Sequence, residues 1–152
     1  MTKDVLIHVT GLQMQEGPDK GSEEPIEIIV PGSYYFRNGN HYLRYEEILD
    51  DSGKPTVNYV RISPTSMEVR KKGLVNVHMV FERGKKSVAY YTTPFGTISM
   101  GIAATGLHFE ESENNMKASV EYSLELNDRY AADCSLELMV LAKHVPENIV
   151  FS

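Results

Sequence analysis

Strict alternation of apolar and polar residues over residues 117–126 constrains the fold of this chain more than any other sequence feature. The apolar set is Ala118, Val120, Tyr122, Leu124 and Leu126, and the polar set is Lys117, Ser119, Glu121, Ser123 and Glu125. A period of two places the two sets on opposite faces of a β-strand. The segment after Asn127 and Asp128 repeats the pattern, which predicts an antiparallel sheet with one buried face.

Length and charge narrow the class of protein further. A chain of 152 residues without linkers or repeats is expected to form one domain over residues 1–152. A net charge of −6 argues against a nucleic-acid partner, which would require a basic surface. The four lysines near two predicted turns are expected on a solvated rim: Lys71, Lys72, Lys85 and Lys86. No apolar segment has the length or flanks of a signal peptide or membrane span, so a cytoplasmic location without a membrane partner is expected.

Turn residues divide the chain into strands and predict their pairing. A strand at residues 3–14 and a strand at residues 26–37 precede Asn38-Gly39, and both of these residues suit a two-residue hairpin turn. That turn pairs Phe36 with His41, Tyr34 with Leu43 and Gly32 with Tyr45. A loop at residues 50–55 predicts that Leu43 faces Ile62 and Tyr45 faces Val60. Leu43, Tyr45, Val60 and Ile62 are then core residues, whereas Arg44 and Arg61 lie outside.

The second half of the chain predicts further hairpins. Lys71-Lys72-Gly73 fits a three-residue turn that pairs Met67 with Val77 and Val69 with Val75. The next strand is expected to point Val88, Tyr90 and Thr92 inward, and the corner Thr93-Pro94-Phe95-Gly96 is expected to place Phe95 over a barrel end. Asn127-Asp128-Arg129 is expected to close the last hairpin, in which Leu124 faces Ala132 and Tyr122 faces Cys134. Together the segments predict an all-β fold: a closed antiparallel up-and-down β-barrel of about 8–10 strands.

Three segments carry a resemblance to a known family. They are Gly32-Ser33-Tyr34-Tyr35, Tyr42-Leu43-Arg44-Tyr45-Glu46-Glu47 and Thr92-Thr93-Pro94-Phe95-Gly96-Thr97. Together they resemble the YwiB-like family of the calycin superfamily, which also contains lipocalins and fatty-acid-binding proteins. The resemblance implies a lipocalin-type barrel and, because the family has no assigned biochemical function, it implies no catalytic residues. The chain lacks the tryptophan of the lipocalin motif, and the loop at residues 15–24 is too short for the helical lid of fatty-acid-binding proteins.

The inward face of the first hairpins contains polar side chains that could bind a ligand. The cavity candidates are Tyr34, His41, Tyr45, Glu47 and Asn58. A carboxylate with phenol and amide neighbours on an apolar wall is typical of an orienting group in a ligand pocket. We expect Glu47 to be satisfied by water or by Asn58, because an unpartnered buried carboxylate is costly.

The opposite face of the same strands contains a second group, with the surface candidates Tyr42, Arg44, Tyr59 and Arg61. The predicted register places Arg44 directly opposite Arg61, with Glu46 diagonally between them. One interpretation is a solvated ladder of charges. The other is a protein-contact surface, since arginine and tyrosine are enriched at such sites.

Motifs for catalysis or cofactor binding are absent from the sequence. Cys134, the single cysteine, falls on the apolar side of its strand and is expected to be a small buried side chain rather than a nucleophile. The histidines show no metal-ligand spacing, and no nucleophile elbow or phosphate loop is present. We therefore expect no metal, no cofactor and no catalytic residues.

Three functions remain. The leading hypothesis is a cytosolic barrel that binds a small apolar or amphipathic molecule. The first alternative is a protein–protein interaction module that uses the exposed arginine and tyrosine face around a packed interior. The second alternative is an enzyme in which Glu47 or His41 acts as an acid or base. The sequence leaves the ligand and the oligomeric state open.

Overall fold

The computed structural model describes residues 3–11, 27–48, 51 and 53–142. Within these residues the chain forms ten antiparallel strands and no helix, so no helix is long and apolar enough to cross a membrane. The strands are β1 (Asp4–Thr10), β2 (Glu27–Arg37), β3 (Asn40–Ile48), β4 (Pro55–Ile62), β5 (Ser66–Lys72), β6 (Val77–Glu82), β7 (Lys86–Thr93), β8 (Gly96–Glu111), β9 (Asn115–Leu126) and β10 (Arg129–Ala142). The predicted strand at residues 3–14 extends beyond the described residues.

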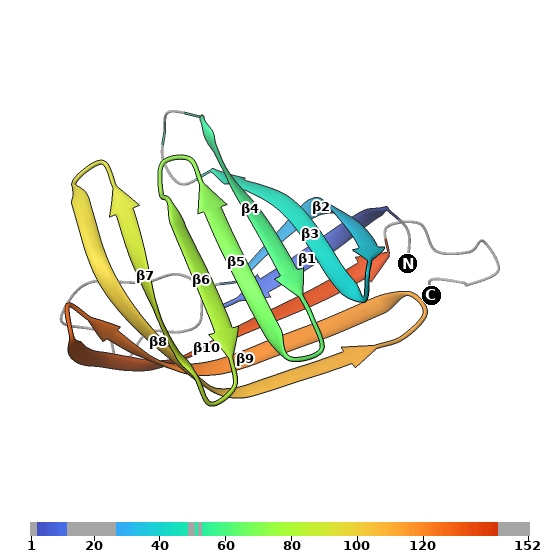
Figure 1. Cartoon of the computed structure of the whole chain (residues 1–152). Coiled ribbons are helices and arrows are strands. Elements are labelled where there is room, and N and C mark those ends of the chain that lie inside the picture. The colour runs from blue at the N-terminus through green and yellow to red at the C-terminus, as the bar shows by residue number, and fades with distance from the viewer. Residues whose placement is uncertain (1–2, 12–26, 49–50, 52, 143–152) are drawn as a thin grey trace.

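The sheet has the order β6-β5-β4-β3-β2-β1-β10-β9-β8-β7, so every pairing joins strands that are consecutive in the chain, apart from that of β1 with β10 (Figure 1). β6 and β7, at the two ends of this order, meet at a bridge in which Asn76 and Thr92 exchange two 2.9 Å backbone hydrogen bonds. The amide of Gly84 also donates to the carbonyl of Ala104 (3.1 Å), and Ser87 Oγ donates to the carbonyl of Val80 (2.8 Å). The sheet therefore curls into a nearly closed barrel, which confirms the predicted fold class.

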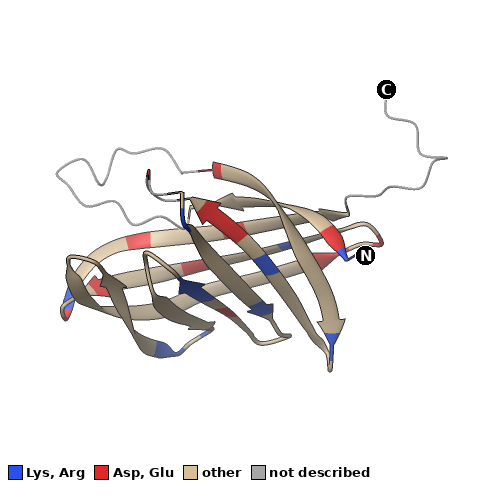
Figure 2. Cartoon of the chain, turned by 90° about the horizontal axis from the view of Figure 1, so that it is seen from above, with Lys and Arg blue, Asp and Glu red and all other residues tan. Residues whose placement is uncertain are grey.

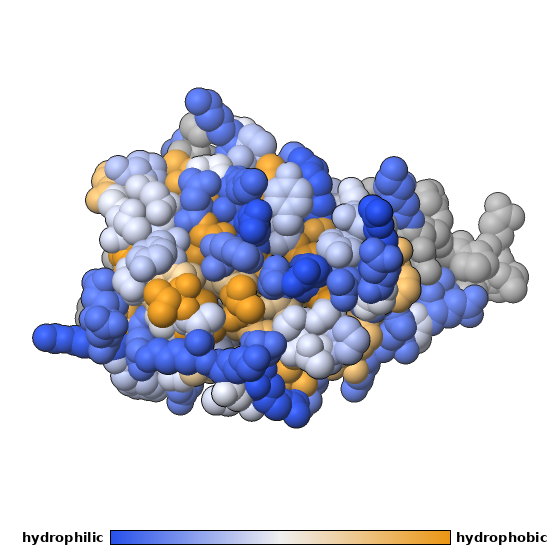
Figure 3. All heavy atoms as spheres, viewed as in Figure 1, coloured by the Kyte–Doolittle hydropathy of each residue, from blue (hydrophilic) through white to orange (hydrophobic). Residues whose placement is uncertain are grey.

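The core lies inside the barrel and draws on all ten strands. Leu43, Tyr45, Val60 and Ile62 each expose 2% of their surface, as predicted. Arg44 is exposed, and 40% of the Arg61 side chain is accessible. Outside, positive and negative residues are interspersed over the strands (Figure 2), and the face shown in Figure 3 is largely hydrophilic with separate small apolar areas.

Two of the predicted hairpin registers are confirmed. Phe36 pairs with His41, Tyr34 with Leu43 and Gly32 with Tyr45. At the other hairpin, Ala132 pairs with Leu124 and Cys134 with Tyr122. Both turns contain consecutive residues with positive φ, at 53° and 81° for residues 38 and 39 and at 50° and 68° for residues 127 and 128. These turns are encoded locally, because few residue types tolerate that backbone conformation.

The predicted register between β3 and β4 is wrong by two residues. Leu43 pairs with Val60 rather than Ile62, and Tyr45 pairs with Asn58. Arg44 therefore lies opposite Tyr59 and Arg61 opposite Tyr42, so the two arginines are not a direct pair. The pairing of Ile48 with Pro55 makes residues 49–54 the connection between β3 and β4. No short turn motif in the sequence fixes the length of this connection, so the register could not be predicted from it. An even shift preserves the face of every side chain, so the predicted core remained correct.

The predicted β5–β6 hairpin is also wrong. Met67 pairs with Phe81 and Val69 with Met79, so the turn lies beyond Gly73. It is stabilised by the side chain of Asn76, whose Nδ2 donates to the Gly73 carbonyl at 2.8 Å and whose Oδ1 accepts from the Gly73 amide at 3.3 Å. Lys71 consequently belongs to the strand and is 7% exposed, which contradicts its expected place on the rim.

The faces predicted for β7 are reversed. Val88 and Tyr90 are 60% and 64% exposed, whereas Ala89 is buried. The turn at Pro94 and Phe95 pairs Ala89 with Met100, which places Ala89 on the inward face that Met100 occupies. Phe95 is 98% exposed and covers no barrel end, contrary to the prediction.

Candidate functional site

The five cavity candidates form two clusters rather than one wall. Tyr34 and His41 lie beside the β2–β3 turn, whereas Tyr45, Glu47 and Asn58 lie toward the opposite end of the barrel. His41 and Glu47 share the inward face of β3 but are separated by six residues, or about 20 Å along an extended strand. We name the two regions the His41 end and the Glu47 end.

At the Glu47 end, three strands bring together a buried ion pair and an amide. Lys71 Nζ of β5 lies 2.5 Å from Glu47 Oε1 of β3, and each of these side chains is 8% exposed. Asn58 of β4, which is fully buried, donates from Nδ2 to the same oxygen at 3.0 Å. Asn58 is the cross-strand neighbour of Lys71, so the correct registers of β3, β4 and β5 together assemble the group.

Two polar atoms in this cluster are buried without a hydrogen-bond partner among the described residues: Thr56 Oγ1 and Asn58 Oδ1. Thr56 is 0% exposed and lies opposite Glu47 in the β3–β4 ladder. Buried polar groups in folded proteins are almost always paired with protein, water or ligand atoms. Each of the two atoms can therefore accept a further hydrogen bond, and the Thr56 hydroxyl can also donate one.

The wall beside the cluster is aromatic and apolar. Burial raises the pKa of the Tyr45 phenol above its ordinary value of 10.0, and the nearby Glu47 carboxylate raises it further. Tyr45 therefore remains a neutral phenol at physiological pH. With Val60 and Val69, it gives the interior an apolar surface next to the polar group.

A pocket of about 490 Å³ lies next to this end of the barrel. Its lining comes from the start of β4 and the residue before it, the segment after β5, and the end of β7 with the turn that follows: Lys54, Pro55, Gly73, Leu74, Asn76, Thr92, Thr93 and Pro94. Gly73 lies directly against Thr56, because a Cβ at Gly73 would stand 2.9 Å from the Thr56 Cα and 3.0 Å from its Oγ1. Only glycine allows this approach, so the unpartnered hydroxyl lies immediately behind the pocket wall.

The His41 end contains a different set of groups. His41 Nδ1 lies 2.8 Å from the Tyr34 hydroxyl, and His41 Nε2 lies 3.6 Å from Glu111 Oε2. Burial lowers the pKa of His41 from its ordinary value of 6.5, against the opposing effect of the Glu111 charge. A neutral ring with its proton on Nε2 fits both contacts, since Tyr34 then donates to Nδ1 and the N–H is directed toward the carboxylate.

Phe109 and Glu111 reach this end because of a β-bulge in β8. Ala104 pairs with Tyr122, but Gly106 already pairs with Glu121, so Thr105 is an extra residue in the ladder. The bulge transfers the inward face from the even positions before it to the odd positions after it. Neither residue was predicted for this site from the sequence, because periodicity without the bulge places both of them outside.

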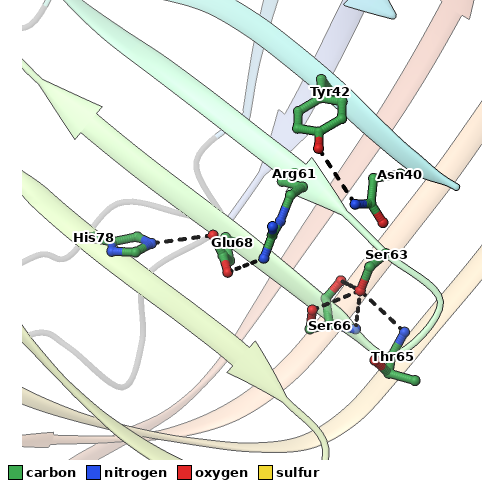
Figure 4. Close-up of polar contacts among 8 residues, drawn as sticks. All are labelled: Asn40, Tyr42, Arg61, Ser63, Thr65, Ser66, Glu68 and His78. Atoms are coloured by element: carbon green, nitrogen blue, oxygen red, sulfur yellow. Dashed lines mark hydrogen bonds and ion pairs between the residues drawn. The ribbon is translucent and has the colours of Figure 1, made fainter. Parts of the chain in front are cut away.

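The four surface candidates do lie together on the outer face. Arg44 Nη2 contacts Glu46 Oε1 at 3.1 Å, and Arg61 is paired with Glu68, which also lies 3.4 Å from His78 Nε2 (Figure 4). Tyr42 stacks on Tyr35, with ring centroids 4.7 Å apart and an interplanar angle of 10°. Tyr35 and Tyr59 are 55% and 44% exposed. Both arginines thus have acidic partners within the sheet.

Cys134 is half-buried rather than fully buried. Burial raises the pKa of its thiol, and the neighbouring Tyr122 opposes this effect. A thiol with a raised pKa is a poor nucleophile at neutral pH. Within the described part of the chain, no three His, Cys, Asp or Glu side chains are grouped closely enough to hold a metal ion.

Comparisons with known proteins agree on one family. Residues 7–138 match the family described as a domain of unknown function, DUF1934. The uncharacterised β-barrel protein YwiB of Bacillus subtilis (strain 168) is 26% identical over 110 residues, which cover 72% of this chain and 76% of YwiB. The crystal structure of YwiB from Bacillus subtilis superposes with a TM-score of 0.76 at 19% identity and covers 93% of both chains.

Proposed function

Because the chain belongs to the DUF1934 family of β-barrel proteins, to which no biochemical function is assigned, we propose from its geometry that it binds a small amphipathic molecule at the Glu47 end. The observation that carries the proposal is the pair of unpartnered atoms, Thr56 Oγ1 and Asn58 Oδ1, beside a buried ion pair. Leaving such atoms unsatisfied costs about 1–3 kcal/mol each. A ligand that pairs with them recovers this free energy on binding.

The chemistry of the cluster defines the ligand class. Asn58 Oδ1 accepts a hydrogen bond, whereas the Thr56 hydroxyl both donates and accepts, so a hydroxyl or amide group is complementary to the two. Glu47 and Lys71 neutralise each other, which favours an uncharged polar group over an ion. A ligand amine or hydroxyl at Glu47 would compete there with the Lys71 amine. The apolar wall favours a hydrocarbon portion next to the polar group.

Displacement of a neutral fluorescent apolar dye tests the proposal. A panel of uncharged metabolites and lipids is titrated against the full chain with the dye bound. Glu47→Gln retains the shape and removes the charge, and Thr56→Val removes the hydroxyl, so both are expected to weaken displacement. Glu46→Gln, on the outer face of the same strand, is the matched control and is expected to have no effect. A wild-type protein that binds neither the dye nor any component of a cell extract would contradict the proposal.

The second candidate function is protein contact through the outer face. The exposed rings of Tyr35 and Tyr59 beside Arg44 favour it, since tyrosine and arginine often dominate interface energetics. The acidic partners of both arginines weaken it, because a binding partner would have to compete with them. Retention of a partner chain by the gently purified protein in native mass spectrometry, with loss after Tyr59→Ala, is the expected result for this function.

The third candidate, acid–base catalysis, has less support. Glu47 is held by Lys71 and Asn58, and no reacting group lies beside it in the described structure. We therefore propose that the protein binds a ligand and does not transform it. We also propose that it acts in the cytoplasm and needs no metal or cofactor.

A further inference from the structure

The His41 end carries exposed aromatic rings that the proposed site at the Glu47 end does not use. Phe36 and Phe109 are 58% and 42% exposed, although both lie on the inward face of their strands. They flank the His41 ring, with centroids 4.8 Å and 4.9 Å away. Neither ring belongs to the buried core cluster, so both leave ring surface available to a ligand.

The exposed side of the Phe36 ring offers a surface for a cation. The Phe36, Phe109 and Tyr34 rings contact the His41 ring at interplanar angles of 54°, 41° and 30°. Of these rings, Phe36 and Tyr34 also line a pocket at this end, together with Tyr35 and Glu111. The faces of aromatic rings attract cations, and organic ammonium groups bind against them.

The charges at this end agree with a cationic ligand group. Half of the Glu111 side chain is exposed, so its carboxylate is accessible from the pocket that it lines. Burial lowers the pKa of His41 and raises that of Tyr34, so both groups are neutral near pH 7. Glu111 therefore contributes a negative charge that no protonated imidazole cancels.

The pocket has room for a small molecule. Its volume is about 520 Å³, and its lining consists of Lys3, Tyr34, Tyr35, Phe36 and Glu111. Lys3 is exposed and is the cationic side chain of this lining. A ligand with an ammonium group for Glu111 and the rings, and a carboxylate for Lys3, matches both charges.

We propose that the His41 end binds a small organic ammonium compound, and that a zwitterion with a carboxylate binds best. The ammonium group lies against Phe36 with Glu111 as its counter-charge, while Lys3 pairs with the carboxylate. This site is independent of the proposed site at the Glu47 end, which lies on the far side of the barrel interior and recognises an uncharged polar group.

Calorimetric titration of the full chain with three compounds of similar shape tests the proposal. Glycine betaine is a zwitterion, choline is a cation and 3,3-dimethylbutanol is the neutral analogue of choline. The expected order of affinity is betaine, then choline, with the neutral analogue about three- to thirtyfold weaker than choline, the factor that corresponds to one cation–π contact. Lys3→Gln is expected to remove the preference for betaine and leave choline binding unchanged.

Variants separate this site from general effects on the fold. Glu111→Gln and Phe36→Leu are each expected to weaken choline binding at least about threefold. Glu110→Gln, the adjacent exposed carboxylate on the other face, is the matched control and is expected to bind as wild type. If Phe36→Leu does not fold, the comparison of Glu111→Gln with Glu110→Gln still tests the site.

Three results would overturn the proposal: no binding of either ammonium compound at millimolar concentration, equal binding of choline and the neutral analogue, or equal losses in Glu111→Gln and Glu110→Gln. Glu47→Gln is expected to bind betaine as wild type does. The proposal for the His41 end and the proposal for the Glu47 end can thus fail separately.

Discussion

Replacing Lys71 by methionine tests whether the Glu47 end of the barrel is a low-dielectric interior. Methionine has a similar length but no charge, so Lys71→Met leaves the Glu47 carboxylate with Asn58 Nδ2 as its remaining contact among the described residues. Removing one partner of a buried ion pair costs about 3–5 kcal/mol, because the other charge is left uncompensated. With side chains that are 8% exposed, Glu47 and Lys71 belong to this class.

The double variant Glu47→Leu/Lys71→Met has a different expected result. Replacing a buried pair by apolar side chains is often neutral or stabilising by about 1–4 kcal/mol. Here Asn58 Nδ2 also loses its acceptor, which costs about 1–3 kcal/mol. The two effects nearly cancel, so the double variant is expected to be about as stable as wild type and clearly more stable than Lys71→Met alone.

The pair of Lys86 and Glu125 provides a matched control on the surface. Its Nζ and Oε2 atoms are also 2.5 Å apart, but the side chains are 53% and 32% exposed. Lys86→Met is therefore expected to cost less than about 1 kcal/mol, as exposed pairs do. The comparison holds the distance constant and changes the burial.

Urea unfolding followed by circular dichroism gives the free energy of unfolding of each variant by linear extrapolation. The reasoning is refuted if Lys71→Met and Lys86→Met cost the same small amount. That result would mean that water reaches Glu47 freely, and the case for a buried ligand site beside it would fail with it.

Five further substitutions test the same structure. Thr56→Val replaces an unpartnered buried hydroxyl by a methyl group and is expected to stabilise the protein by about 1 kcal/mol, measured as a rise in the urea midpoint; destabilisation would show that the hydroxyl has a partner. Gly32→Ala is expected to lower the melting temperature by several degrees, because its Cβ would stand 2.5 Å from Ile7 Cδ1 and 2.7 Å from the Arg44 carbonyl oxygen. Leu43→Ala is expected to cost about 2–4 kcal/mol and Arg44→Ala less than about 1, and reversed costs would contradict the assigned faces. Burial lowers the pKa of His41 in the folded state, so the unfolded chain binds a proton at this residue more readily. The contribution of neutral His41 to folding stability is fully present above about pH 6.5 and is lost as the pH falls through the folded pKa. His41→Phe is therefore expected to flatten this part of the profile of urea midpoint against pH.

How far the fold could be predicted depended on whether each signal was local. Asn38-Gly39 specifies its own turn through positive φ, and its register was predicted correctly. At the last hairpin the turn has two residues instead of the three predicted, and a β-bulge at Ala131 gives the predicted pairing of Leu124 with Ala132. Gly53 and Gly73 also have positive φ, but neither fixes the length of its connection, and there the registers were wrong. The faces of β3, β4 and β5 were nevertheless right, because the register errors were even and side chains alternate with a period of two.

The candidate site was predictable only in part for the same reason. Alternation along β3 places His41 and Glu47 on the inward face, and they are buried there. It does not indicate that Lys71 reaches Glu47, because that contact depends on the register of two further strands. Lys71 was instead expected on a solvated rim, because lysine is rarely buried without a partner.

The sequence by itself determined the all-β class, the two locally encoded hairpins and the face of most core side chains, since period and turn chemistry act over a few residues. The tertiary structure alone decided which polar groups meet. A bulge at Thr105 turns Phe109 and Glu111 inward, and closure of the barrel brings them to His41, which lies about seventy residues earlier in the chain. These contacts depend on strand register, bulge position and barrel closure, which arise from packing across the whole sheet and leave no periodic trace in the residues they join.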